Sequence, residues 1–403
     1  MGNGMNAASE LPINDLSSNG LLTIDIGALR HNYVTLQSLA PTAEMAAVVK
    51  ADAYGIGADK AAPALYNAGC RIFFVALFHE ALALRNLLPR DALVYVLNGL
   101  LPSQENLCSE LEIRPVLNSL AQIREWNSLG QSLGKKLNAA VQIDSGMSRL
   151  GLSSDELESL KSSPDLLKQI EIDFVMSHLA CADEPDHPQN ARQRDNFDTA
   201  VTIFGDVKHC FSNSGGLFLG EAFHKSIIRP GISLYGVSPV RSLQTALKPV
   251  VSLNAAVIQT RRVKAGTAIG YGANYVAPAN MTLATIAAGY ADGLPRSLSN
   301  RGAAYFKGTR LPIVGRVSMD SIILDVSALN EDELQLGDMV ELIGPNQSLD
   351  DLADAAGTIA YEILTSLGNR YKRQYLGTET INLTNERDAL PFAASTLSAS
   401  AFQ

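Results

Sequence analysis

Short apolar runs alternate with longer segments of helical periodicity between residues 21 and 247. Runs rich in Val, Ile and Phe occur at residues 46–50, 72–76, 93–97, 115–117, 139–143, 172–176, 207–211 and 231–235. The clearest helical segments between them are residues 59–68, 79–88, 119–129 and 189–204. Such alternation is typical of βα units, and eight units close a (β/α)8 barrel. We therefore predict an α/β fold with an N-terminal TIM-type barrel over residues 21–247, although a doubly wound sheet would give almost the same pattern.

After residue 249 the chain changes, and strand-like runs follow one another without long helices between them. These runs lie at residues 251–263, 282–287, 311–317, 321–326 and 338–343. Two helical segments follow, at residues 349–356 and 358–367, with Gly357 between them. The pattern predicts a C-terminal mostly-β domain over residues 248–386. We expect loose tails at residues 1–20, rich in Asn, Ser and Gly, and at residues 387–403, rich in Ala and Ser.

Charge and cysteine content narrow the class of protein. The chain has 32 Lys and Arg against 41 Asp and Glu, a net charge of −9, so we expect no nucleic-acid or anionic membrane partner. Its four cysteines, Cys70, Cys108, Cys181 and Cys210, form no C-x-x-C pair, which predicts reduced thiols and no metal site. No run approaches the ~18 apolar residues of a membrane span, and residues 1–20 do not resemble a signal peptide, so we expect a cytoplasmic protein.

Basic side chains stand at the ends of several predicted strands, where barrel enzymes place their reactive groups. Lys50 ends the first run, and burial there would lower the pKa of its amine, as an imine-forming lysine requires. Arg149 follows the fifth run, and its forked guanidinium suits a carboxylate. Taken singly, each has a plain structural interpretation, as a lysine stem covering apolar surface or as a surface arginine.

Three more polar groups follow the later runs. His178 follows the sixth run, Ser214 lies in a Ser-Gly-Gly segment after the seventh, and Arg229 precedes the eighth. Alone, His178 is more often structural and Arg229 more often a salt-bridge partner. Backbone N–H groups beside Ser214 could bind a phosphate, as the loops after strands seven and eight do in many barrels. Together the five groups predict a pocket for a phosphate-bearing carbonyl compound that condenses with lysine, which is pyridoxal 5′-phosphate.

Seven separate motifs resemble those of the alanine racemase family of fold-type III pyridoxal-phosphate enzymes. They are AVVKADAYG at residues 47–55, DSGMSRLG at 144–151, SHLACADE at 177–184, RPGISLYG at 229–236, GYGANY at 270–275, GYADGLPR at 289–296 and GRVSMD at 315–320. The resemblance implies a barrel, a C-terminal β domain and a head-to-tail homodimer in which that domain completes the partner subunit's active site. It also implies the interconversion of L-alanine and D-alanine, with D-alanine supplied to peptidoglycan, although degradation of D-alanine stays open.

The resemblance implies a role for individual residues. Lys50 would hold the cofactor covalently, and Tyr271 would be the opposing acid–base group, contributed across the dimer. Two groups on opposite faces can remove and return the α-proton without rotation of the intermediate. The residues implied to surround the cofactor are Tyr54, Ser214, Gly231, Ile232 and Tyr361 at the phosphate, His178 beside the ring and Arg229 at the pyridine nitrogen. Those implied to meet the substrate are Arg149 and Met319 at its carboxylate and Tyr290 at the entrance.

Two positions depart from the family pattern. Gln142 stands where many members carry a carbamylated lysine that orients the arginine corresponding to Arg149. A neutral amide accepts a hydrogen bond but supplies no full charge, so we expect a raised Michaelis constant with turnover retained. Ile56 stands where histidine is usual, and we expect a minor local effect.

Three other functions are compatible with a lysine-bearing barrel of this kind. A fold-type III decarboxylase would place a carboxylate at the pyridine nitrogen and lack a counterpart of Tyr271, so Arg229 and Tyr271 favour racemisation. A non-catalytic pyridoxal-phosphate-binding protein would be a single barrel. The sequence does not distinguish an alanine racemase as clearly from a serine racemase or a racemase of broader specificity, so the strictness of the alanine preference stays open.

Overall fold

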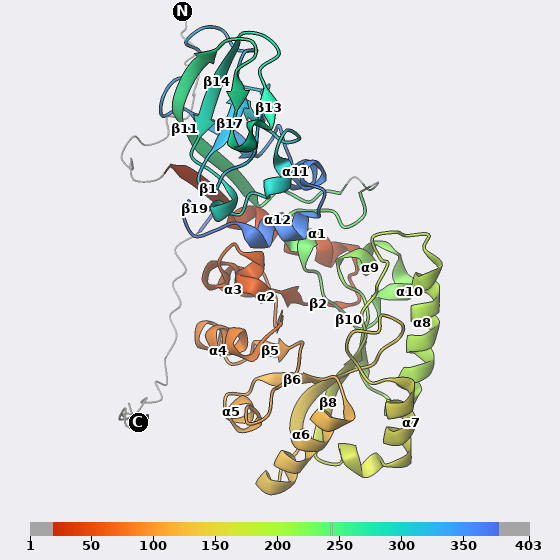
Figure 1. Cartoon of the computed structure of the whole chain (residues 1–403). Coiled ribbons are helices and arrows are strands. Elements are labelled where there is room, and N and C mark those ends of the chain that lie inside the picture. Colours follow the sequence, from red (N-terminus) through yellow and green to blue (C-terminus); the bar gives the residue numbers. More distant parts are fainter. Residues whose placement is uncertain (1–18, 242, 244, 379–403) are drawn as a thin grey trace, which may run out of the picture.

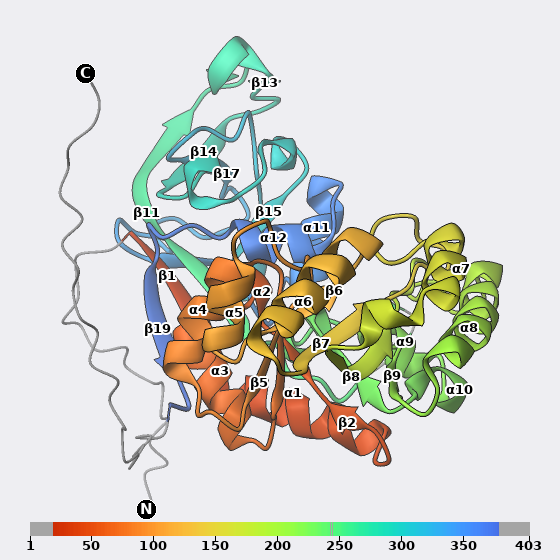
Figure 2. The same ribbon diagram turned by 90° about the horizontal axis from the view of Figure 1, so that it is seen from below.

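The computed structural model describes residues 19–241, 243 and 245–378. The predicted tail at 387–403, nearly all of the tail at 1–20 and the predicted domain end at residue 386 lie outside these residues. Figures 1 and 2 show a barrel surrounded by helices, with a second, mostly β unit beside it. No helix of the described part is both long and apolar enough to cross a membrane.

The barrel is one sheet in which every strand pair is parallel. Its order is β2-β10-β9-β8-β7-β6-β5-β4-β3. β2 and β3 are parts of one strand interrupted at Ala46, whose N–H donates to the Ile228 carbonyl at 2.9 Å, so the first and last strands meet and the barrel closes. The strands are β2 (Glu44–Met45), β3 (Ala47–Val48), β4 (Ile72–Val75), β5 (Leu93–Val96), β6 (Arg114–Leu117), β7 (Leu137–Gln142), β8 (Ile170–Met176), β9 (Lys208–Cys210) and β10 (Ile227–Ile228). The predicted barrel fold is confirmed.

Helices connect the barrel strands and cover the outside of the sheet (Figure 2). The helix over Leu120–Leu133 (α6) shows how such a helix begins and ends. The Ser119 hydroxyl accepts a hydrogen bond from the Gln122 N–H at its start, and Gly134 ends it with a left-handed φ of 63°. The helices are α1 (Ile26–Leu39), α2 (Lys50–Tyr54), α3 (Ala58–Asn67), α4 (Phe78–Leu87), α5 (Glu105–Glu110), α6 (Leu120–Leu133), α7 (Ser154–Ser162), η1 (Pro164–Leu167), α8 (Pro188–Ala200), η2 (Val201–Phe204), α9 (Ser214–Phe218), α10 (Glu221–His224) and η3 (Ile232–Tyr235).

The eighth predicted strand is wrong. Residues 232–235 form the 3-10 helix η3, and the last barrel strand is β10, just before Arg229 and Pro230. Pro230 has no N–H to donate to a ladder, and the side chains of Ile232 and Leu234 are buried in a turn instead. Hydrophobicity alone does not separate a buried turn from a buried strand.

The second unit is built on an eight-stranded, mostly antiparallel sheet. Its central path is β16-β15-β18-β11-β1-β19, with β14 joining β11 to β17, and β12 pairs with β13 separately. Its elements are β1 (Gly20–Asp25), β11 (Val251–Val263), β12 (Ala268–Ile269), η4 (Tyr271–Ala273), β13 (Tyr275–Val276), β14 (Met281–Ile286), η5 (Tyr290–Asp292), η6 (Arg296–Leu298), β15 (Ala303–Phe306), β16 (Thr309–Pro312), β17 (Ile322–Asp325), β18 (Met339–Ile343), α11 (Leu349–Ala356), α12 (Ala360–Ser366) and β19 (Lys372–Leu376). One large core cluster extends through both units.

The first strand of the described chain lies in the second sheet. β1 pairs antiparallel with β11 and parallel with β19, and it buries Leu22 and Ile24 there. Residues 21–25 were predicted to belong to the barrel, but the barrel segment begins with α1. The alternating burial of β1 is typical of a strand with one covered face, and only the tertiary structure identifies its partners.

Candidate active site

Lys50 begins a left-handed turn at the end of the first barrel strand. Ala51, Asp52, Ala53 and Tyr54 have φ angles of 52°, 54°, 53° and 55°, and the Gly55 N–H closes the turn on the Ala51 carbonyl at 2.8 Å. Left-handed backbone costs a residue with a side chain about 1–2 kcal/mol. Such a turn persists only where surrounding contacts hold it.

Glu80 on α4 is one of these contacts. Its carboxylate accepts the N–H groups of Ala51 at 2.6 Å, Ala76 at 2.8 Å and Leu77 at 2.9 Å. The sequence prediction did not include Glu80, although an acidic residue in the first turn of a helix after a barrel strand is a visible signal.

The amine of Lys50 lies in a strongly positive environment. Burial lowers its pKa, and the charges of Arg149 and Arg229 act in the same direction against the opposing charge of Glu80. A lowered pKa leaves more of the amine neutral and nucleophilic. The direction agrees with the expectation from its place at an apolar strand end.

Arg229 lies inside the barrel mouth with 2% of its surface exposed. Its guanidinium donates to the carbonyls of Ser177 at 2.9 Å and Cys210 at 3.1 Å, and it contacts the Cys210 sulfur at 3.0 Å. It also lies 3.4 Å from Nδ1 of His178. Since guanidinium only donates, that nitrogen of His178 accepts.

His178 is a neutral imidazole in this setting. Burial, then the charges of Arg229, Arg149 and Lys50, hold its pKa well below 6.5. A second ring contact is with the Asn213 amide at 3.5 Å. The structure thus brings together three of the side chains that the sequence predicted at separate strand ends, Lys50, His178 and Arg229.

A small cradle lies beside them. The Ser214 hydroxyl accepts the N–H groups of Gly231 at 2.8 Å and Ser233 at 3.3 Å. A Cβ on Gly231 would overlap the Tyr54 hydroxyl, so only glycine permits this approach. Ile232 is fully buried and follows directly as the first residue of η3. The predicted phosphate residues of the barrel are therefore neighbours.

Tyr361 reaches this cradle from the C-terminal domain. Its ring centroid lies 6.2 Å from that of Tyr54, which stacks on Tyr235 at 4.5 Å. Burial raises the pKa of Tyr54, and burial together with the charges of Asp183 and Asp350 raises the pKa of Tyr361 to about 12. Both phenols are therefore neutral hydrogen-bond donors at physiological pH. A cavity of about 430 Å³ opens here, lined among others by His178, Asn213, Gly215 and Tyr361.

Neither Tyr271 nor Met319 is among the residues that line this cavity in the described chain. The β12–β13 hairpin around Tyr271 is at the end of the C-terminal domain away from the barrel (Figures 1 and 2). Tyr271 is 71% exposed, Met319 52% and Tyr290 44%. Arg149 makes no hydrogen bond or ion pair with any described residue, and the Gln142 amide donates to the Leu150 carbonyl at 3.2 Å.

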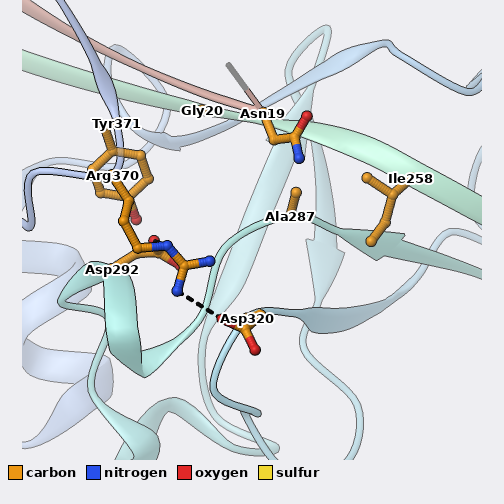
Figure 3. A pocket seen from close by; sticks show the side chains of 8 residues that line it. All are labelled: Asn19, Gly20, Ile258, Ala287, Asp292, Asp320, Arg370 and Tyr371. Carbon is orange, nitrogen blue, oxygen red and sulfur yellow. Dashed lines mark hydrogen bonds and ion pairs between the residues drawn. The ribbon is translucent and has the colours of Figure 1, made fainter. Parts of the chain in front are cut away.

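Arg370 fixes the two loops that carry Tyr290 and Met319. Its guanidinium pairs with Asp292 at 3.1 Å and Asp320 at 2.6 Å, beside a cavity of about 420 Å³ (Figure 3). The Tyr290 N–H donates to the Ser318 carbonyl at 3.0 Å, which ties the loops together. Tyr290 and Met319 therefore form one exposed surface.

The fold and the site together describe an α/β barrel with a buried lysine at the end of its first strand and a cradle formed by Ser214 and Gly231 beside Tyr54. Two family models match the chain, "Alanine racemase, N-terminal domain" over residues 24–239 and "Alanine racemase, C-terminal domain" over residues 250–375. The chain belongs to the alanine racemase family, whose members are isomerases.

Individual relatives agree with this assignment. The catabolic alanine racemase of Agrobacterium fabrum is 60% identical over 359 residues, 89% of this chain and 92% of that protein. The alanine racemase of Brucella canis is 53% identical over 376 residues, 90% and 95% of the two chains. The crystal structure of alanine racemase from Bartonella henselae with covalently bound pyridoxal phosphate has a TM-score of 0.87 and 46% identity, covering 89% of this chain and 100% of that chain.

Proposed function

We propose that this protein interconverts L-alanine and D-alanine with pyridoxal 5′-phosphate as its cofactor. The observation that carries the proposal is the turn over residues 50–54, which begins with Lys50 and ends with Tyr54, whose hydroxyl lies against Gly231 of the cradle. A lysine that bonds a carbonyl and a cradle that binds its phosphate are the two attachments this cofactor needs.

The residues present fit that cofactor. The Tyr54 hydroxyl has no hydrogen-bond partner among the described residues. It lies against Gly231, where the Cβ of any other residue would overlap it. Arg229 is buried beside His178. Its guanidinium forms no ion pair with a carboxylate of the described chain. When bound, the cofactor supplies the electron withdrawal that acidifies the α-proton of an attached amino acid.

The roles proposed for the protein residues follow from their chemistry. Lys50, with its lowered pKa, holds the cofactor and then exchanges a proton on one face of the α-carbon. Tyr271 exchanges a proton on the other face. Arg149, whose guanidinium has no partner in the described chain, binds the substrate carboxylate.

We propose that Tyr271, Met319 and Tyr290 act in the active site of a partner subunit. Support comes from the exposure of all three, together with the position of β13, which lies away from α2 of its own chain in Figure 1. The result is a homodimer with shared sites. Free thiols at all four cysteines, three of them buried, support the proposed cytoplasmic location.

For the direction of the reaction in the cell we propose a catabolic role. The expected supply of D-alanine for peptidoglycan rested on the family resemblance alone, whereas the 60% identical Agrobacterium fabrum relative is named catabolic. Deletion of the gene should then abolish growth on alanine as carbon source and leave growth without added D-alanine intact. A strict requirement for D-alanine would contradict this role.

The activity is tested by following optical rotation of L-alanine, L-serine and L-lysine in separate incubations with the purified protein. We expect loss of rotation with L-alanine, and borohydride should fix the cofactor on Lys50. Lys50→Ala and Tyr271→Phe should each abolish racemisation, with Tyr66→Phe, a surface tyrosine bonded to Asp91, as the control. Full racemisation by Tyr271→Phe would overturn the two-base mechanism.

The shared site is tested by mixing the two inactive variants. Random reassociation makes half of the dimers hybrid, and each hybrid holds one site with both native residues. We therefore expect roughly a quarter of native activity to return. No recovery in mixtures that demonstrably exchange subunits would exclude a site built from two chains.

A further inference from the structure

The left-handed turn after Lys50 is held from the far side by the last described strand. The Tyr375 hydroxyl donates to the Ile56 carbonyl at 2.9 Å, and the Arg373 guanidinium donates to the Gly55 carbonyl at 2.7 Å. Both side chains come from β19 of the C-terminal domain, two residues apart and so on one face of the strand.

The fit between β19, α12 and the turn leaves no spare room. A Cβ on Gly57 would lie 2.5 Å from the Tyr375 hydroxyl, and a Cβ on Gly55 would lie 2.8 Å from the Leu364 carbonyl of α12. The two glycines have φ angles of 100° and 85°, which glycine adopts without strain. The backbone at residues 55–57 therefore lies directly against the C-terminal domain.

The turn needs such support because its conformation is unfavourable in isolation. Four consecutive residues with side chains have left-handed φ, and each would relax toward right-handed or extended backbone if released. Glu80 holds the start of the turn at Ala51 from the barrel. Arg373 and Tyr375 hold the two carbonyls just beyond its end.

We propose that Arg373 and Tyr375 are positioning residues that keep the turn in its left-handed form, and with it the Lys50 amine and the Tyr54 hydroxyl. Cofactor binding by the barrel then depends on the C-terminal domain of the same chain, separately from the contribution that domain makes to a partner subunit. The inference rests on the roles proposed for Lys50 and Tyr54. Its structural content, that β19 holds the turn, is independent of those roles.

The variants are Tyr375→Phe, Arg373→Met and the double variant, with Arg373→Lys to restore one donor. Tyr305→Phe and Arg310→Met are matched controls, because these residues lie on β15 and β16 of the same sheet and make no hydrogen bond through their side chains in the described chain. We measure the dissociation constant of pyridoxal phosphate from the absorbance of the lysine-bound cofactor. In parallel we follow hydrogen exchange of the amides of residues 51–57 in the cofactor-free protein.

Each lost bond should weaken cofactor binding about fivefold, which corresponds to roughly 1 kcal/mol. Exchange at residues 51–57 should accelerate in the same variants, with Arg373→Lys closer to native protein and both controls unchanged. Tyr375→Phe removes a single oxygen, so it keeps the test usable if Arg373→Met does not fold.

Three negative results have different meanings. Native exchange rates at residues 51–57 in Tyr375→Phe would overturn the proposed support of the turn, whatever the protein binds. Failure of the native protein itself to bind pyridoxal phosphate would overturn the proposed function, while accelerated exchange in the variants would still establish the support. Accelerated exchange with native cofactor affinity would refute the link between the turn and the cofactor.

Discussion

Ser214 and Ser233 provide a sensitive test of the cradle, because the two hydroxyl groups are buried side by side in opposite situations. The Ser214 oxygen accepts two backbone N–H groups, at 2.8 Å and 3.3 Å, and the residue is 4% exposed. The Ser233 oxygen is buried without a partner in the described chain. Replacement by alanine should therefore affect stability in opposite directions.

The expected magnitudes follow from these contacts. Ser214→Ala leaves two buried N–H groups without an acceptor in the cofactor-free protein, and an unmet buried group costs about 1–3 kcal/mol. The bond from the Ser233 N–H is the longer and weaker of the two, so its loss should cost less than the loss of the bond from Gly231. For both together we expect a loss of about 2–4 kcal/mol in the free energy of unfolding. Ser233→Ala removes a group that has no partner, so we expect a change within about 1 kcal/mol, toward greater stability.

The assay is urea unfolding of the cofactor-free variants, followed by tryptophan fluorescence. The chain has one tryptophan, Trp126, buried on α6 of the barrel, so the signal reports on the unit that contains the cradle. Added pyridoxal phosphate should reduce the deficit of Ser214→Ala, since phosphate oxygens can accept the released N–H groups. Equal unfolding midpoints for the two variants, or a larger loss for Ser233→Ala, would refute the reasoning.

Three further predictions concern the same end of the barrel. The pKa of His178 lies well below 6.5 in the folded protein, so the unfolded chain binds a proton there more readily than the folded protein does. The free energy of unfolding should therefore fall as the pH drops below about 6.5, by at most ~1.4 kcal/mol per pH unit. Urea midpoints should accordingly fall less between pH 7 and pH 5 in His178→Gln than in native protein, and an equal fall would contradict the shift. Gly231→Ala places a methyl group against the Tyr54 hydroxyl, so it should weaken cofactor binding by more than about tenfold, equivalent to ~1.4 kcal/mol. An unchanged dissociation constant for pyridoxal phosphate would show that Gly231 is not part of the cofactor site. Gln142→Lys should lower the Michaelis constant for alanine if a carbamate forms and orients Arg149, and unchanged kinetics would count against that account.

Much of the barrel was predictable from the sequence because its strands are locally encoded. Each buried strand is an apolar run bounded by turn residues, and seven of the eight runs coincide with observed strands. The same locality made Lys50, His178, Ser214 and Arg229 visible as polar groups at or beside strand ends. Parallel strands of a closed barrel end at one face, so residues far apart in the sequence meet there.

Contacts between parts of the chain that are distant in sequence could not be predicted from the sequence pattern. β1 pairs with β11 and β19 across most of the chain length, and the Glu80 carboxylate contacts the turn after Lys50 from a different helix. The Cys210 sulfur against Arg229 likewise has no signal in spacing or periodicity.

The sequence by itself determined seven of the barrel strands, their order and the residue types at their ends, since these depend on local periodicity and composition. The tertiary structure alone decided the left-handed turn at residues 51–54 and its support by β19. Four side-chain-bearing residues adopt an unfavourable φ there only because groups from α4, α12 and β19 converge on the turn, and no local propensity predicts that convergence.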